Sequence, residues 1–210
     1  MARIFLIRHG ETAANNEKRY QGQIDTPLNK TGIQQAKALA ELLSNVPFSR
    51  IYTTPLQRAQ KTALLLAQVQ KKKNILILPG LLERNFGQWE DLTFTEIKRR
   101  YPKIYATWLN TPYAKIPGAE PFPAFRKRVL DCLRSVLKTL PAEETIAIVA
   151  HGGPNRIILH HFLGSSDKKD FWKIKQDNAC VNIIELQPHY QMISLLNYHI
   201  GNFQKRSLKY

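Results

Sequence analysis

The sequence is poor in several features that would place a protein in a narrow class. Its 210 residues include two cysteines, Cys132 and Cys180, and no C-x-x-C pair, so we expect neither a disulfide framework nor a cysteine-based zinc site. No apolar run is long enough to span a membrane, and the first one lacks the small-residue cleavage pattern of a signal peptide. We therefore expect a cytoplasmic protein with two reduced thiols that does not act at a membrane.

Acidic residues are also scarce. The chain has 16 Asp and Glu against 31 Lys and Arg, a net charge of +15, which favours anionic partners such as nucleic acid, a membrane surface or phosphorylated metabolites. The basic residues are scattered, with short runs at 71–73, 98–100 and 168–169 that are typical of solvated helix ends and loops. Because aromatic and basic residues do not interleave as on a stacking surface, nucleic acid is not the expected partner despite the charge.

What the sequence does contain is a regular alternation of apolar runs and helical periodicity. Strands are expected at 4–7, 50–53, 75–78, 145–150, 181–186 and 192–196. Helices are expected to start at Thr31, at Pro55, near Thr93, at Phe122 and at Pro154, whereas 102–123 is predicted to be loop-rich. With no internal repeat or linker, the alternation predicts a single α/β domain over 1–210. Its form is a three-layer sandwich, with a mostly parallel sheet and helices on both faces.

Polar side chains follow four of the predicted strands. Arg8 and His9 come directly after the strand at 4–7, and His151 comes directly after the strand at 145–150. Arg58 lies one turn into the helix after the strand at 50–53, and Glu83 follows the strand at 75–78. Because the carboxyl ends of parallel strands meet at the same edge of a sheet, we expect these five side chains at one rim.

These residue types suit the transfer of a phosphoryl group. A neutral imidazole such as His9 is a competent nucleophile toward phosphorus, and a phosphohistidine divides a difficult hydrolysis into two easier steps. Arg8 and Arg58 present planar forks to the phosphate oxygens, while His151 and the start of the helix behind it add donors. Glu83 has the chemistry to protonate the leaving alkoxide and then to act as a base toward water. We expect no metal and no cofactor, because these cations neutralise the phosphoryl group.

Each of these residues also has a plain structural explanation. Either histidine alone is more typical of a hydrogen-bonded surface group, and Glu83 alone of a solvated loop carboxylate. Arg8 alone has a possible ion-pair partner in Glu11. A metal site on His9 and His151 is an alternative that remains open at this stage. The joint placement of R-H-G and H-G-G after two apolar strands is what favours phosphoryl chemistry.

Further segments around these residues form a recognisable series. They are Arg8–Thr12, Gly22–Leu28 with Thr31-Gly32 and Gln35-Ala36 after it, Tyr52–Ala63, Leu82–Glu90 and Ala150–Gly153. The series covers nearly the whole chain and resembles, in order, the motifs of the histidine phosphatase (phosphoglycerate mutase-like) superfamily. The resemblance implies a phosphoglycerate mutase-like α/β sandwich with an inserted segment that caps the site, expected here at about 93–123.

The resemblance also implies roles for the matching residues. His9 matches the phosphorylated nucleophile and Glu83 the proton donor. The phosphate pocket would be formed by Arg8, Arg58, His151 and the amide of Gly152. Asn15, Gln21 and Gly22 lie where the family makes further phosphate or substrate contacts.

The segment 85–90 indicates a branch of the family. Asn85–Glu90 is closer to the phosphatases, which include α-ribazole phosphatase-like and broad-specificity members, than to the longer mutases with Met-Tyr in place of Asn85-Phe86. We therefore expect a metal-independent phosphomonoesterase that acts on small phosphorylated metabolites through His9. The alternatives are a phosphoglycerate mutase and, from the charge alone, a non-catalytic module that binds phosphorylated or nucleic-acid ligands. Candidate pocket walls, which core packing explains equally well, are Phe86, Trp89, Tyr105 and Trp108.

Overall fold

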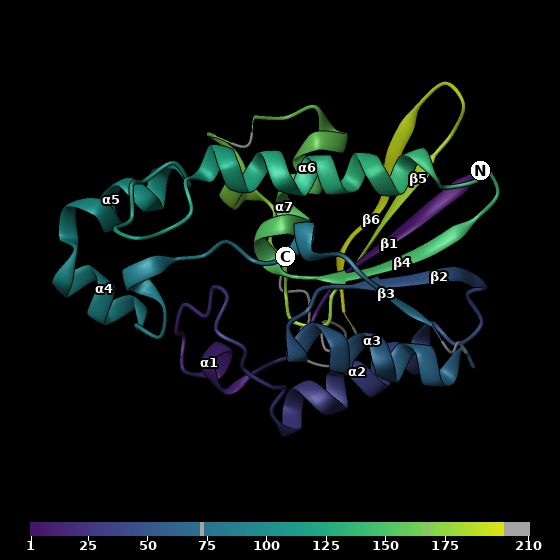
Figure 1. The fold of residues 1–210 in the computed structure, drawn as a ribbon, viewed down its shortest axis with the longest axis horizontal. Coiled ribbons are helices and arrows are strands. Elements are labelled where there is room, and N and C mark those ends of the chain that lie inside the picture. The colour runs from purple at the N-terminus through teal and green to yellow at the C-terminus, as the bar shows by residue number, and fades with distance from the viewer. Residues whose placement is uncertain (72–73, 167, 200–210) are drawn as a thin grey trace, which may run out of the picture.

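The structure, a computed structural model, describes residues 1–71, 74–166 and 168–199, so Lys72 and Lys73 of the basic run at 71–73 lie outside the described residues. Within them the chain forms a six-stranded sheet in the order β3-β2-β4-β1-β5-β6 (Figure 1). The first four strands are parallel, and β5 runs antiparallel to β1 and β6, which confirms the predicted mostly parallel sheet. The bounds are β1 (Ala2–Arg8), β2 (Phe48–Thr53), β3 (Ile75–Ile77), β4 (Thr145–Ala150), β5 (Val181–Leu186) and β6 (Gln191–Tyr198).

The most buried strand, β4, sets the position of the strand ends. It lies between β2 and β1, and every residue in it is buried, as is typical of a strand in the middle of a parallel sheet. Its register with β1 pairs Arg8 with Ala150, and the amide of His9 donates to the carbonyl of Ala150 at 3.1 Å. The next residues along the two strands, His9 and His151, are therefore held side by side.

Helices cover both faces of the sheet, as predicted (Figure 1). α2 (Lys30–Leu42) and α3 (Gln57–Val69) pack on one face, where Phe5 and Ile7 of β1 belong to their core. α6 (Phe122–Lys138) and α7 (Gly152–Leu163) pack on the other face, with Ile4 and Leu6. Successive side chains of a strand point to opposite faces, so β1 contributes to two separate apolar cores.

The start of α3 corrects a prediction. We expected Pro55 in its first turn, but the helix begins at Gln57, and Pro55 lies in the preceding loop. The N-cap residue Leu56 makes no side-chain hydrogen bond. Instead, the carboxylate of Asp25 accepts from the amide of Gln57 at 2.7 Å. Because the cap comes from a distant segment, it leaves no local signal in the sequence, and the prediction started the helix too early.

The segment 93–123 is more helical than predicted. α4 (Phe94–Arg100) was expected, and Thr93 caps it through a capping box with Glu96. A second helix, α5 (Pro102–Asn110), occupies a stretch that we predicted as loop-rich. Pro102 lies in its first turn, where a missing N–H costs no hydrogen bond, so this proline starts the helix and does not break it. Figure 1 shows α4 and α5 at the end of the molecule farthest from the N-terminus.

A third apolar cluster lies outside the two cores of the sheet. Its buried members are Trp89, Ile97, Trp108, Ala114 and Ile116, and it joins α4 and α5 to the loop at 86–92. The shorter elements of the described chain are α1 (Ala13–Asn16) and the 3-10 helices η1 (Pro79–Leu81), η2 (Gly87–Trp89) and η3 (Phe171–Lys173). None of the described helices is both long and apolar enough to cross a membrane.

Candidate active site

A cavity of about 250 Å³ lies at the carboxyl ends of β1 and β4. The predicted site residues that line it are Arg8, His9, Asn15, Gln21, Arg58, Glu83 and Gly152. Two further candidates, Gly22 and His151, lie close by but outside its lining. The parallel register of β1 and β4 and the helices that follow β2 and β4 therefore bring most of the predicted set to one rim.

His9 is buried at the bottom of this cavity, with 3% of its surface exposed. Its ring Nδ1 lies 2.7 Å from the carbonyl oxygen of Gly10, and its own carbonyl accepts from the amide of Ala179. Burial, followed by the nearby guanidinium groups of Arg58 and Arg8, lowers the pKa of His9 well below its ordinary value. The imidazole is therefore neutral at physiological pH and rigidly oriented by its hydrogen bond.

His151 lies directly beside His9. The two rings meet edge to face, with centroids 5.2 Å apart and planes at 61°. His151 is fully buried, and its Nε2 lies 2.8 Å from the hydroxyl oxygen of Thr54. Burial and the charge of Arg58 lower the pKa of His151 well below the ordinary value, so this ring is neutral as well.

Two arginines place their positive charges near His9. Arg58 is 1% exposed and donates to the carbonyls of Ile24 and Gly22, at 2.7 and 2.8 Å. Gly22 thus orients Arg58 and does not itself face the cavity. Arg8 donates from Nη1 to the carbonyl of Gln176. Burial lowers the pKa of both arginines, to about 10 for Arg58, yet guanidinium groups stay protonated at neutral pH.

Three buried nitrogen atoms around His9 have no hydrogen-bond partner within the described residues. They are Nε of Arg8, Nε of Arg58 and Nδ1 of His151. Buried polar groups in folded proteins are nearly always paired, so unpaired nitrogens gathered in one place indicate a site for an acceptor. The two positive charges beside them favour an anion as that acceptor.

Glu83 reaches the same cavity from the loop after β3. One oxygen of its carboxylate accepts from the amide of Gly153 at 3.0 Å, and the other accepts from the amide of Arg84 at 2.9 Å. A Cβ on Gly153 would stand 2.1 Å from this carboxylate, so only glycine allows the contact. Arg128 of α6, which the sequence analysis missed, donates to the carbonyl of Glu83 and pairs with Glu120. Two backbone amides therefore hold the carboxylate, and Arg128 holds the backbone of the same residue.

Asn15 and Gln21 lie at the rim of the cavity and belong to one hydrogen-bond network. Asn15 accepts from the amide of Thr12 at 3.2 Å and from the side-chain amide of Asn178 at 3.0 Å. Gln21 accepts from the hydroxyl of Thr12 at 2.8 Å. Thr12 also caps α1 with Asn15, so this one residue positions both side chains.

Aromatic side chains form the opposite wall of the cavity. Phe86 and Trp108 line it, whereas Trp89 and Tyr105 pack behind them in the third apolar cluster. Two of the four candidates from the sequence therefore line the cavity, and the other two belong to the packing behind it. Six further aromatic residues complete the lining: Tyr20, Phe94, Phe122, Phe125, Phe171 and Trp172.

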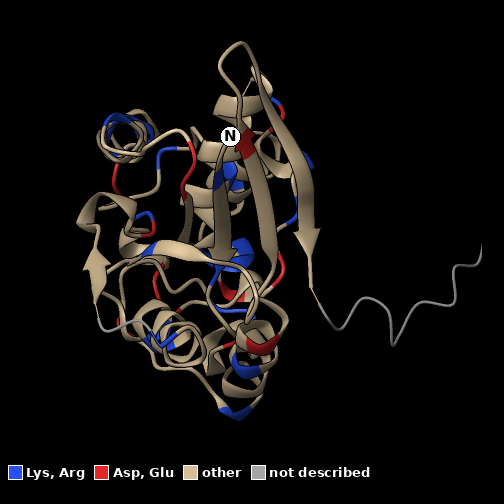
Figure 2. Ribbon diagram, turned by 90° about the vertical axis from the view of Figure 1, so that its right-hand side faces the viewer, with Lys and Arg blue, Asp and Glu red and all other residues tan. Residues whose placement is uncertain are grey.

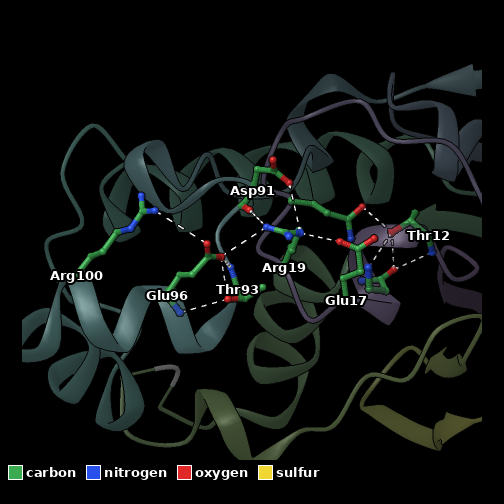
Figure 3. Close-up of polar contacts among 9 residues, drawn as sticks. Thr12, Glu17, Arg19, Asp91, Thr93, Glu96 and Arg100 are labelled. Carbon is green, nitrogen blue, oxygen red and sulfur yellow. Dashed lines mark hydrogen bonds and ion pairs between the residues drawn. The ribbon is translucent and has the colours of Figure 1, made fainter.

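Three more arginines line the cavity and were missed from the sequence. Arg19 is held by acidic groups: its Nε lies 2.7 Å from Glu17, and its Nη1 lies 3.6 Å from Glu96 (Figure 3). Arg84 is 2% exposed and donates to the backbone carbonyls of 120 and 112. Arg156 lies one helical turn after Gly152, a spacing that would have indicated a shared helix face. Figure 2 shows other Lys and Arg residues spread over the molecule.

The described residues do not form a group of three or more His, Cys, Asp or Glu side chains that could hold a metal ion. Within the described chain the two histidines therefore have no third ligand of this kind, in contrast to the alternative of a metal site on His9 and His151. Glu83 is the carboxylate of the cavity lining within the described chain. All five guanidinium groups that line the cavity donate to backbone carbonyls.

Several known proteins similar to this chain are phosphatases. Residues 4–199 match the histidine phosphatase superfamily (branch 1). Phosphoserine phosphatase 1 of Hydrogenobacter thermophilus is 32% identical over 97% of this chain and 96% of its own length. The metal-independent phosphoserine phosphatase of Arabidopsis thaliana is 34% identical over 88% of this chain and 76% of its own length.

A solved structure agrees with these relatives. The putative α-ribazole-5′-P phosphatase of Escherichia coli has a TM-score of 0.84 at 31% identity, and the match covers 94% of this chain and 96% of that one. The predicted resemblance and the phosphatase branch are thus confirmed. The chain belongs to the histidine phosphatase superfamily, branch 1, and is an enzyme that hydrolyses phosphate esters.

Proposed function

We propose that the protein is a metal-independent phosphomonoesterase that hydrolyses small phosphorylated metabolites through a phosphohistidine on Nε2 of His9. The observation that carries this proposal is the environment of His9, a buried neutral ring between Arg8 and Arg58 with its Nδ1 beside the carbonyl of Gly10. A carbonyl oxygen only accepts hydrogen bonds, so the ring proton belongs on Nδ1 and the lone pair on Nε2. That lone pair is the nucleophile.

In the first step, Nε2 of His9 forms a bond to phosphorus while the ester P–O bond breaks. The proton of the Glu83 carboxylic acid goes to the leaving alkoxide, which departs as an alcohol. The ring becomes a phosphoimidazolium, and the carbonyl of Gly10 stabilises its Nδ1–H. Glu83 suits this transfer because two backbone amides orient its carboxyl group toward the cavity.

In the second step, water attacks phosphorus and the N–P bond breaks. The Glu83 carboxylate takes a proton from the water, so that both Glu83 and neutral His9 return to their starting states. Inorganic phosphate leaves the cavity. The alcohol from the first step departs before or with the water attack, and the reaction consumes one water molecule for each ester hydrolysed.

The charge of the transferring group is matched by fixed donors. Arg8 and Arg58 present nitrogen atoms that lack partners in the described chain, and the N-terminus of α7 at Gly152 adds its amide dipoles. If the hydroxyl of Thr54 donates to Nε2 of His151, the proton of that ring lies on Nδ1, and His151 adds a further donor. These groups supply the charge stabilisation that a metal ion provides elsewhere.

We assign the remaining candidates by their contacts. Asn15 and Gln21 line the rim and contact the phosphate or the substrate there. Gly22 acts through Arg58, because its carbonyl accepts a hydrogen bond from that guanidinium. These three residues orient the bound group and take no part in bond breaking.

The segment 93–123 is proposed to cap the site as an insertion within one domain. Trp108 of α5 donates from Nε1 to the hydroxyl of Tyr20 at 2.5 Å, and its carbonyl accepts from Trp172 at 3.0 Å. The amide of Gln88 donates to the carbonyl of Pro117 at 3.0 Å. These contacts attach the segment at several points, and its aromatic residues cover the side of the cavity away from His9.

We infer a cytoplasmic location from the cysteines. Cys132 and Cys180 are unpaired, and free thiols are typical of reducing compartments. Burial raises the pKa of the Cys180 thiol to about 11, so this side chain is unreactive and has a packing role.

The substitution His9→Ala tests the mechanism. We expect hydrolysis of p-nitrophenyl phosphate to fall by about 10⁴-fold or more, because the nucleophile is lost. After brief mixing with labelled substrate, the wild type is expected to carry an acid-labile phosphoryl label that the variant lacks. The exposed His189, in the turn between β5 and β6, offers the matched control His189→Ala, which keeps its activity. Activity retained by His9→Ala would disprove the proposal.

Two additions to this assay separate the alternatives. A chelator is expected to leave the wild-type rate unchanged, and inhibition by chelation would contradict a metal-independent mechanism. A phosphoglycerate mutase has the same nucleophile but returns the phosphoryl group to its substrate, so 3-phosphoglycerate distinguishes the two activities. We expect inorganic phosphate to be released from it faster than 2-phosphoglycerate is formed, and the reverse would establish the mutase.

A further inference from the structure

The loop that carries Glu83 is attached to α6 through one arginine. Arg128 of α6 donates from Nη1 to the carbonyls of Gly80 and Leu82, at 3.0 and 2.8 Å. Its Nη2 donates to the carbonyl of Glu83 at 2.9 Å. Three carbonyls of one short segment, which ends at the proposed proton donor, therefore converge on a single guanidinium group.

An ion pair with Glu120 engages the remaining N–H groups of Arg128. Nε and Nη2 donate to the two carboxylate oxygens of Glu120, at 2.7 and 2.9 Å. A guanidinium group has five N–H groups, and each of them has an acceptor here. The Cζ of Arg128 also lies 4.9 Å from the ring centroid of Phe125, one turn earlier in α6. The planar fork is therefore fixed in place, and a lysine, with three N–H groups, cannot make the same contacts.

Glu120 holds the same loop through its backbone as well. Its amide donates to the carbonyl of Asn85 at 3.0 Å, and its carbonyl accepts from Nε of Arg84 at 2.8 Å. The side chains of Arg128 and Glu120 are 25% and 18% exposed, so water screens this pair less than it screens a fully exposed pair. The loop around Glu83 is therefore held both by α6 and by the backbone at Glu120.

Close packing on both sides of the loop makes the position of the Glu83 carboxyl group depend on α6. A Cβ on Gly80 would stand 2.6 Å from Cβ of Cys132, so the backbone of the loop lies directly against α6. The carboxylate of Glu83 lies against the N-terminus of α7, where it accepts from the amide of Gly153. The side chain of Gln23 also donates to the carbonyl of Glu83, at 3.0 Å. Loss of Arg128 should therefore shift the loop without releasing it.

We propose that Arg128 is a positioning residue for the proton donor: it places the carboxyl group of Glu83 at the leaving oxygen, and Glu120 orients Arg128. This inference rests on the proposed function, in which Glu83 protonates the leaving alkoxide. Within the described residues, the cavity lining includes neither Arg128 nor Glu120, so both act through Glu83 and not on the substrate. Proton transfer requires donor and acceptor within hydrogen-bond reach, so a displaced carboxyl group slows the departure of an alkoxide. A leaving group that needs no proton is insensitive to the displacement.

The substitution Arg128→Lys tests this, because it keeps the positive charge and removes the fork. In the first turnover, we expect the release of serine from O-phosphoserine to slow by about 10- to 100-fold, the effect of a small displacement of a catalytic group. The release of nitrophenolate from p-nitrophenyl phosphate is expected to slow by less than about threefold. Glu120→Gln should give the same contrast with a smaller loss. Arg134→Lys is the matched control with no effect on either ester, because the side chain of Arg134, which pairs with Asp131 of the same helix, is 64% exposed.

Combination with Glu83→Gln distinguishes positioning from a general structural role. If Arg128 acts through Glu83, adding Arg128→Lys to Glu83→Gln should slow serine release no further. Additive losses would overturn the proposal, as would equal losses on both esters or unchanged rates in Arg128→Lys. If Arg128→Lys does not fold, the same criteria applied to Glu120→Gln decide the matter.

The single variant Glu83→Gln reports separately on the proposed function. An equal first-turnover loss on both esters in this variant would refute Glu83 as the proton donor. A contrast between the esters in Glu83→Gln, with none in Arg128→Lys or Glu120→Gln, would refute only the positioning role of Arg128.

Discussion

The two sides of the cavity are built in different ways. The phosphate side is built on residues at the ends of β1 and β4, such as Arg8 and His9, whose backbone is tied into the sheet by ladder hydrogen bonds. Arg58 of α3 and Glu83 of the loop after β3 lie beside them. The aromatic side comes largely from loops and from the segment 93–123, which has a small apolar cluster of its own around Trp89 and Trp108. One side is an extension of the main core, and the other is attached to it.

This difference implies that the two sides of the cavity have different functions. Groups that stabilise a transferring phosphoryl group must hold their positions within fractions of an ångström, and strand ends in a closely packed sheet provide that rigidity. The walls that contact the rest of the substrate need less exact positions. Loops and insertions outside the main core, which vary more than the sheet, can form such walls. Changes on the phosphate side should therefore affect every substrate, and changes on the aromatic side should affect some substrates or local stability.

After the loss of the nucleophile in His9→Ala, the largest effect on the phosphate side is expected from Glu83→Gln. Loss of the general acid should reduce kcat for an alkyl phosphate such as O-phosphoserine by about 10²–10⁴-fold. With p-nitrophenyl phosphate the first step should slow much less, at most about tenfold, because nitrophenolate leaves without being protonated. Rates of alcohol release in the first turnover measure the contrast, because the later water attack uses Glu83 as a base with either ester. An equal loss on both esters in this first turnover would mean that Glu83 does not act as the proton donor.

Arg58→Gln should reduce kcat/KM by about 10²–10³-fold, the typical cost of removing one donor from a developing anion. We expect the factor to be the same for every phosphomonoester tested, because Arg58 contacts only the part that all of them share. Lys61→Gln, at an exposed position of the same helix, is the control for changes in α3. A loss that varied strongly with the leaving group would place Arg58 on the selective side of the cavity.

Trp108→Ala should break the attachment of the segment 93–123. Trp108 is 4% exposed, and truncating a buried tryptophan costs about 3–5 kcal/mol of stability. Hydrogen exchange is expected to speed up in α4 and α5 while the amides of β1 and β4 keep their protection. Leu109→Ala tests the same helix at a residue that is 59% exposed and should have little effect. Equal loss of protection in the sheet would show that the two regions unfold together.

Arg19→Gln should have a small effect, because its ion pairs are partly exposed. The side chain of Arg19 is 30% exposed and those of its partners are 53% and 32% exposed, so solvent screens these pairs and we expect only a small loss in the free energy of unfolding. Urea titrations at low and at 1 M salt measure it, and salt should shrink the difference between variant and wild type. A loss that is large and unaffected by salt would mean that Arg19 has a packing role instead.

The smallest change is expected in the charge of the two histidines on mild acidification. Their folded pKa values lie well below the ordinary value of about 6.5, so at pH 6.0 both rings should remain neutral while free histidine is mostly protonated. The unfolded chain binds more protons than the folded one in this range, so stability should decrease as the pH falls below about 6.5. Imidazole NMR shifts and melting temperatures test both statements. A protonated His9 at pH 6.0 would contradict a neutral nucleophile.

Much of the phosphate side was predictable from the sequence because its information is local. A buried apolar strand followed at once by R-H-G or H-G-G identifies the element and the residues it delivers, and parallel strands end at one edge of the sheet. The order of strands and helices followed from their periodicities in the same way. The start of α3 and the helix α5 did not, because a cap from Asp25 and a helix-starting Pro102 depend on context.

The sequence by itself thus determined the α/β architecture and the set His9, Arg8, Arg58 and Glu83 at one rim. Only the tertiary structure decided that His151 lies beside His9, that Gly22 holds Arg58, and that Phe86 faces the cavity while Trp89 does not. It also brought Arg156 next to Arg8. The physical reason is that the direction of a side chain depends on the segments packed around it. Those segments are far apart in the chain and leave no contiguous pattern in the sequence.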